Sequence, residues 1–87
     1  MKLILAIVRD PDADAVTSGL TTADFRVTRV ASTGGLLRRG MTTLLIGLEA
    51  DQVDAAIGIL RQTCTPAAPG EKRATIFVIP VDKFEQI

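Results

Sequence analysis

Histidine, tryptophan, tyrosine and asparagine are absent from this 87-residue sequence, and cysteine occurs once. Without histidine, the chain has no imidazole to act as the base of a catalytic triad or as a zinc ligand. The single thiol, Cys64, excludes an internal disulfide and a multi-cysteine metal site. No carboxylates or lysines pair at a spacing that suggests acid–base catalysis. The composition therefore predicts a protein that is not an enzyme and that needs no metal or cofactor.

A net charge, large aromatic side chains and long apolar runs are also missing. Ten basic and ten acidic residues give zero formal net charge, so no broad field attracts nucleic acid or an anionic membrane. Three phenylalanines are the only aromatic residues, and a small sheet protein with so few has reason to bury more surface by self-association. No apolar run is long enough to span a membrane, and residues 1–8 lack a cleavage pattern. We expect one cytoplasmic domain over residues 1–87.

Four segments of the chain are apolar enough to form strands. The continuous apolar run of the first predicts a central strand covered on both faces. In the third, Gly47 predicts a bulge or the close approach of another backbone. Pro80 ends the fourth or places it at a sheet edge. The four segments are residues 3–8, 25–32, 42–48 and 74–79.

Two helices are predicted between these strands. Asp10 as N-cap and Pro11 as the first helical residue begin one, and Asp51 is the candidate N-cap of the other. The two apolar stripes are Val16, Leu20 and Ala23, and Val53, Ala56, Ile57, Leu60 and Cys64. Because Cys64 falls on the second stripe, we interpret it as a small buried hydrophobe.

The resulting order, β-α-β-β-α-β, predicts an α+β fold, a ferredoxin-like sandwich with two helices on one face of a four-stranded antiparallel sheet. The other sheet face keeps apolar side chains without cover in the chain. Self-association through that face would cover them. Residues 65–73, with two prolines and a glycine, form the loop before the last strand.

The stretch 25–47 combines a Gly34-Gly35 pair with four arginines, at positions 26, 29, 38 and 39. Such a turn can present backbone N–H groups to an anion. Alternation also puts Arg26 and Thr28 on one strand face, which suits a phosphate or a polar base edge. The simpler interpretation is a glycine turn with solvated charges beside a strand with one solvated face.

Other functions of this fold lack their residues. A copper or zinc carrier needs a CxxC pair, and an RRM needs base-stacking aromatics on its central strands. An acylphosphatase-like enzyme needs an anion-cradling loop after the first strand and an asparagine to orient water. Ligand sensing and pure assembly remain open.

The segments MKLILAIV, FRVTRVASTGGLLRRG, TTLLIG and ATIFVIPVDKFEQ resemble the PII-like cyclic-di-AMP receptor family of bacteria. The resemblance covers residues 1–64 and 73–86. It implies a homotrimer that binds one cyclic di-AMP in each cleft between subunits and signals to a downstream protein. The contact positions that it implies are Arg26, Thr28, Gly35, Leu36, Leu37, Met41, Gly47, Phe77 and Gln86, the last two from a neighbouring subunit or the chain end.

Three departures from the family pattern bear on the ligand. Leu36 stands where the family usually has an aromatic beside the adenine, and Met41 where it usually has an asparagine. The long family loop before the last strand is reduced to residues 65–73. The alternative is therefore a trimeric interaction module of the same fold that has lost cyclic di-AMP or binds another adenine nucleotide.

Overall fold

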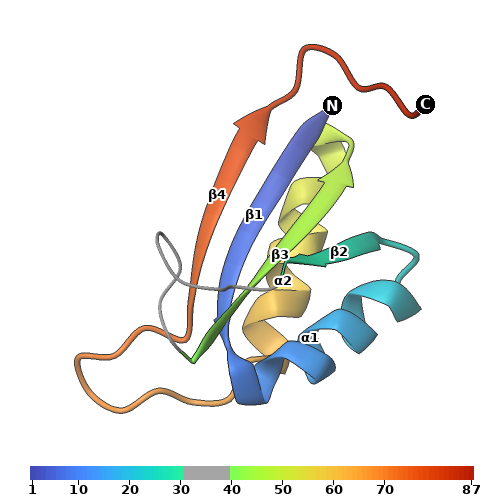
Figure 1. Cartoon of the computed structure of the whole chain (residues 1–87). Coiled ribbons are helices and arrows are strands. Elements are labelled where there is room, and N and C mark those ends of the chain that lie inside the picture. Colours follow the sequence, from blue (N-terminus) through green and yellow to red (C-terminus); the bar gives the residue numbers. More distant parts are fainter. Residues whose placement is uncertain (31–39) are drawn as a thin grey trace.

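In the computed structural model, which describes residues 1–30 and 40–87, four strands form one antiparallel sheet in the order β2-β3-β1-β4. Figure 1 shows both helices on the same side of this sheet, with the two chain ends near one another. The fold is thus the predicted ferredoxin-like α+β sandwich. The elements are β1 (Lys2–Arg9), α1 (Asp10–Thr22), β2 (Arg26–Val30), β3 (Met41–Leu48), a 3-10 turn η1 (Ala50–Gln52), α2 (Val53–Thr63) and β4 (Ala74–Pro80).

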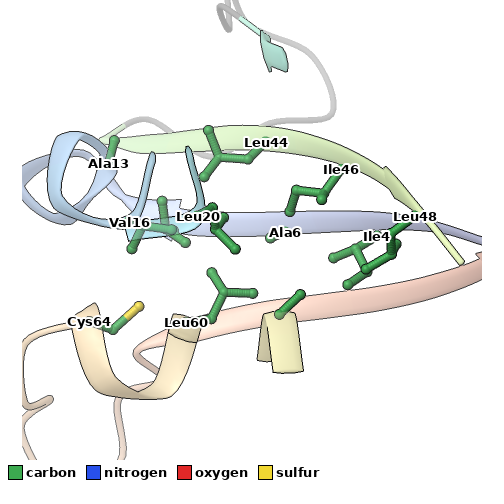
Figure 2. Close-up of a cluster of buried hydrophobic side chains, with 12 residues drawn as sticks. Ile4, Ala6, Ala13, Val16, Leu20, Leu44, Ile46, Leu48, Leu60 and Cys64 are labelled. Atoms are coloured by element: carbon green, nitrogen blue, oxygen red, sulfur yellow. The ribbon is translucent and has the colours of Figure 1, made fainter. Parts of the chain in front are cut away.

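The hydrophobic core lies between the sheet and the two helices, as the close-up in Figure 2 shows. Strand alternation supplies one half of it, because every second residue of β1 and β3 points to the helices. The core comprises Ile4, Ala6 and Val8 of β1, Leu44, Ile46 and Leu48 of β3, Ala13, Val16 and Leu20 of α1, and Ala56, Leu60 and Cys64 at α2. The predicted burial of Cys64 is confirmed.

The helices begin elsewhere than predicted. Asp10 is the first residue of α1, not its N-cap, because β1 runs into the helix through the extended backbone of Arg9. Pro11 still lies in the first turn, where its missing N–H has no helical partner to lose. Asp51 is inside η1, which begins earlier because Glu49 and Gln52 cap each other's backbone N–H groups. Ala23 is exposed at the end of α1, outside the buried stripe.

The strand predictions hold with two corrections. Pairing runs without interruption through Gly47, which lies opposite Leu3 and Arg26, so the predicted bulge is wrong. A Cβ there would first meet the Met1 side chain, at 3.5 Å, and no backbone atom within residues 1–30 and 40–87 lies as close. β1 is central, but the helices cover only one of its faces. β4 is an edge strand that ends at Pro80, as its proline predicted.

The sheet face away from the helices, here called the open face, is apolar over its centre. Leu3, Leu5 and Ile7 of β1 point to it, and Leu5 lies between Leu45 and Phe77 in register. Phe77 is 53% exposed. Within residues 1–30 and 40–87, no helix or strand covers this face, and only the C-terminal tail reaches its edge, beside Leu3 and Leu45.

Candidate functional site

Two polar side chains predicted to bind a ligand stand side by side at one edge of the open face. Arg26 and Thr28 belong to β2, where their partners across the strand pair are Gly47 and Leu45. Period-two alternation puts both side chains on the open face, and both are exposed. Arg26 forms no ion pair within residues 1–30 and 40–87. Its guanidinium therefore remains available to an anion.

A hollow of about 490 Å³ lies at this edge. Four of the predicted contact residues line it: Arg26, Thr28, Gly47 and Gln86. Apolar side chains make up the rest of its wall, from Met1, Leu3, Leu45 and Phe84. The C-terminal tail, residues 81–87, thus returns to the start of β2 and adds Phe84 and Gln86. We call this hollow the β2 hollow.

The other predicted residues are elsewhere. Met41 is at the far end of β3, six residues from Gly47, so the two are separated by about 20 Å of extended strand. It lines a different hollow, with Ile7 and Thr75. Phe77 is on β4, which is separated from β2 by β3 and β1, or about 14 Å at ordinary strand spacing. Gly35, Leu36 and Leu37 lie outside the described residues.

One arginine of the predicted cluster faces the wrong way for an anion on the open face. Arg29 is on the helix side of β2, where its Nη2 lies 2.8 Å from Oδ1 of Asp14 and 3.4 Å from the Thr17 hydroxyl. The expectation that it joins Arg26 is therefore wrong. Arg38 and Arg39 lie outside the described residues.

A second polar cluster, which the sequence pattern did not indicate, ties β1 and α1 to the loop before β4. Asp12 is 2% exposed, and its carboxylate accepts hydrogen bonds from the Thr65 hydroxyl, at 2.8 Å, and the Thr65 N–H, at 3.3 Å. Arg9 Nη2 lies 3.0 Å from its Oδ2 and also bonds the Thr65 carbonyl. Burial alone would raise the pKa of Asp12, but the Thr65 hydrogen bonds and the Arg9 charge outweigh it and hold that pKa below its ordinary value.

Asp10, next to this cluster, holds the start of β3. Its N–H donates to the Gly40 carbonyl, at 2.9 Å, and its carboxylate accepts a 2.5 Å hydrogen bond from the Thr42 hydroxyl. The end of the glycine-containing segment and the start of residues 65–73 are thus both fixed to the β1–α1 junction. The short loop is anchored at its other end by Arg73, which donates to the Arg61 carbonyl at 3.0 Å.

Within residues 1–30 and 40–87, no three side chains of the metal-binding types lie close together. No helix found there is long and apolar enough to cross a membrane.

A family model described as "cyclic-di-AMP receptor" matches residues 1–68, more than three quarters of the sequence. The chain belongs to the cyclic-di-AMP receptor family. The family match includes the predicted contact positions from Arg26 to Gly47, and it ends inside the loop before β4. Phe77 and Gln86 lie beyond it, so their assignment stays a prediction from the sequence resemblance.

Among solved structures, the chain of this cyclic-di-AMP receptor family member is similar to a functionally unknown protein from Pediococcus pentosaceus ATCC 25745. The two sequences are 33% identical, and the alignment covers 99% of this chain and 96% of the other. The TM-score is 0.78, and the coverage extends the likeness over β4 and the tail, which the family match does not reach.

Proposed function

We propose that this protein is a homotrimeric signalling receptor that binds cyclic di-AMP at clefts between its subunits. The observation that carries the proposal is the β2 hollow, where the Arg26 guanidinium, which has no ion pair within residues 1–30 and 40–87, and the Thr28 hydroxyl stand beside Gly47 and Gln86. A guanidinium binds phosphate oxygens through charge-assisted hydrogen bonds. Gly47 leaves room there for a base to approach the strand.

The spread of the predicted contacts over the open face supports a shared site. Met41 and Phe77 are too far from the β2 hollow to join it within one chain. A neighbouring copy packed on the open face would bring its own Phe77 or Met41 to the hollow. It would also cover the half-buried Leu3, Leu5 and Ile7 of β1 and the exposed Phe77 of β4, which favours association.

The proposed role is recognition without catalysis. Cyclic di-AMP binding in the cytoplasm would change the surface offered to a downstream protein. Residues 70–72, in the loop before β4, line the hollow of Met41, another of the expected contact positions, and belong to that surface. The alternative function is a trimeric interaction module that has lost this ligand or binds another adenine nucleotide. Leu36 and Met41 favour that alternative, because an aromatic and an asparagine are expected in a strong site.

Calorimetric titration with cyclic di-AMP tests the proposal. Arg26→Ala should weaken binding by about ten- to a hundredfold, because it removes a charge-assisted hydrogen bond worth about 1.5–3 kcal/mol. Arg29→Ala is the matched control, since Arg29 faces α1 and should leave the affinity unchanged. Light scattering should give about three times the 9.3 kDa chain mass. If the wild-type protein is a trimer but binds no adenine nucleotide at millimolar concentration, the receptor proposal is wrong. The alternative function, a trimeric interaction module, would then be supported.

A further inference from the structure

Phe84 is an aromatic residue that the contact positions expected from the sequence do not include. It lies on the tail that follows β4, its side chain is 60% exposed, and it lines the β2 hollow with Arg26 and Thr28. We propose that the Phe84 ring stacks on a purine base of the bound nucleotide and makes the site selective for it. This inference rests on the proposed function, because it assumes that the β2 hollow takes the nucleotide.

A backbone hydrogen bond holds the start of the C-terminal tail close to the β2 hollow, where Phe84 could contact a bound base. The Val81 N–H donates to the Met1 carbonyl at 3.1 Å, which fixes the tail beside the first residue of the chain. Lys83 and Glu85, on either side of Phe84, form an ion pair of 3.2 Å with each other. Figure 1 shows the tail turning from the end of β4 across the end of the sheet where the chain begins. Phe84 thereby reaches β2 from the opposite edge strand.

The chemistry of the hollow matches a base joined to a phosphate. Leu3 and Leu45 give it an apolar floor, while Arg26 supplies a cation. Every base offers a flat π-face, and a purine offers the larger one, so an exposed ring next to a cation suits an adenine nucleotide. Leu36 cannot provide such a ring. Phe84 can therefore supply the stacking that the sequence resemblance expects from an aromatic at position 36.

A second copy of the chain could fill the β2 hollow itself instead of bordering a bound nucleotide, and Arg26 argues against that arrangement. A protein surface that filled the hollow and buried Phe84 would also remove Arg26 from water, and within residues 1–30 and 40–87 this guanidinium has no ion-pair partner in its own chain. Burial of an unpaired charge is costly, whereas a phosphate would neutralise it. The hollow is thus better suited to an anionic ligand than to an apolar contact.

The absence of tryptophan and tyrosine allows a direct test. In Phe84→Trp, the introduced indole is the only strong fluorophore of the protein, so its emission reports contact with the base. Addition of cyclic di-AMP should quench it with a saturable dependence on concentration. Ile87→Trp places the same fluorophore on the same tail, outside the β2 hollow, and its emission should stay nearly constant.

Calorimetry with cyclic di-AMP provides the affinity readout. Phe84→Leu keeps an apolar side chain but no ring, and it should bind about ten- to a hundredfold more weakly than wild type. Phe84→Tyr keeps the ring and should retain most of the affinity. Light scattering on each variant shows whether assembly has changed.

The outcomes separate this inference from the proposed function. If wild type binds cyclic di-AMP, but Phe84→Leu binds equally well and the indole of Phe84→Trp is not quenched, only the stacking role of Phe84 fails. If Phe84→Leu lowers the mass of the assembly, Phe84 is an interface residue and the inference is wrong. If wild type does not bind cyclic di-AMP, the proposed function and the inference fail together.

Discussion

Arg9 and Asp12 form an ion pair at the start of α1, with 3.0 Å between Nη2 and Oδ2, and the carboxylate is almost completely buried. The pair does not stand alone, because Thr65 donates two hydrogen bonds to the same carboxylate. Removal of a buried carboxylate that is both ion-paired and hydrogen-bonded destabilises the folded protein, because its partners, here Arg9 and Thr65, are left without the charge and the acceptor that they contact. The cluster thus fixes the short loop before β4 to the body of the fold.

Asp12→Ala should lower the free energy of unfolding by about 2–3 kcal/mol, as expected for the loss of hydrogen bonds to a buried charge. Asp14→Ala is the matched control on the same helix. Its carboxylate also pairs with an arginine, at 2.8 Å, but it is 93% exposed, so the expected loss is at most about 1 kcal/mol. Urea denaturation of both variants at neutral pH measures the difference. Equal losses would show that the Asp12 cluster is no stronger than a surface ion pair.

The same carboxylate predicts how stability depends on pH. Its pKa in the folded protein is below the ordinary value of about 3.9, so the folded state holds the charged form more strongly than the unfolded state does. The stabilisation is complete above the unfolded pKa and is lost as the pH falls through the folded pKa. The difference in unfolding free energy between wild type and Asp12→Asn should therefore be constant from pH 7 to about 5 and shrink below about 4. A difference that grows on acidification would contradict this sign.

Cys64 should react slowly with a thiol reagent while the protein is folded. The residue is 6% exposed, and burial, together with the nearby negative charge of Asp12, raises the pKa of its thiol. Little thiolate is then present at neutral pH, and the reagent has poor access to it. The same sample in denaturant should react quickly and with one equivalent per chain, because no other cysteine exists. Rapid labelling of the folded protein would mean that α2 opens easily or is packed differently.

The fold could be predicted because its signals are local and periodic. The stripe on α2 places Ala56, Leu60 and Cys64 in the core, and the alternation of β2 places Arg26 and Thr28 on the other face. The same period assigns Arg29 to the helix side. The expectation that four arginines gather near the Gly34-Gly35 pair rested only on their closeness in sequence and did not take the strand period into account.

Other features could not be predicted because they depend on contacts between distant parts of the chain. Asp12 and Thr65 are 53 residues apart, and no pattern in either segment indicates the pair. Phe84 is in a tail without periodicity, so only the folded chain shows that it reaches β2. An isolated glycine in a strand suggested a bulge or a close backbone approach at Gly47. The pairing of β3 with β1 and β2 is nevertheless uninterrupted there, and Gly47 instead lines the β2 hollow.

Restoring the family residues at two positions should separate a weakened receptor from a scaffold that does not use the nucleotide. Leu36→Phe adds a ring where the resemblance expects one beside the adenine, and a base–aromatic contact is worth about 1–3 kcal/mol. Met41→Asn adds a hydrogen-bonding group at the start of β3, where the present thioether makes only a weak acceptor. We expect each variant to bind cyclic di-AMP more tightly than wild type, and the double variant to bind most tightly.

Calorimetric titration of wild type, both single variants and the double variant measures this gain, with Leu36→Ile as the control for a change of shape without a ring. If the two positions contact different parts of the ligand, their effects should add within about 0.5 kcal/mol. Unfolding in urea should show similar stability for all variants, because a gain in affinity must not reflect a better folded protein. If the double variant binds no more tightly than wild type, these positions do not contact cyclic di-AMP in this protein. The interaction module, or a different adenine nucleotide, would then be the better account of the open face.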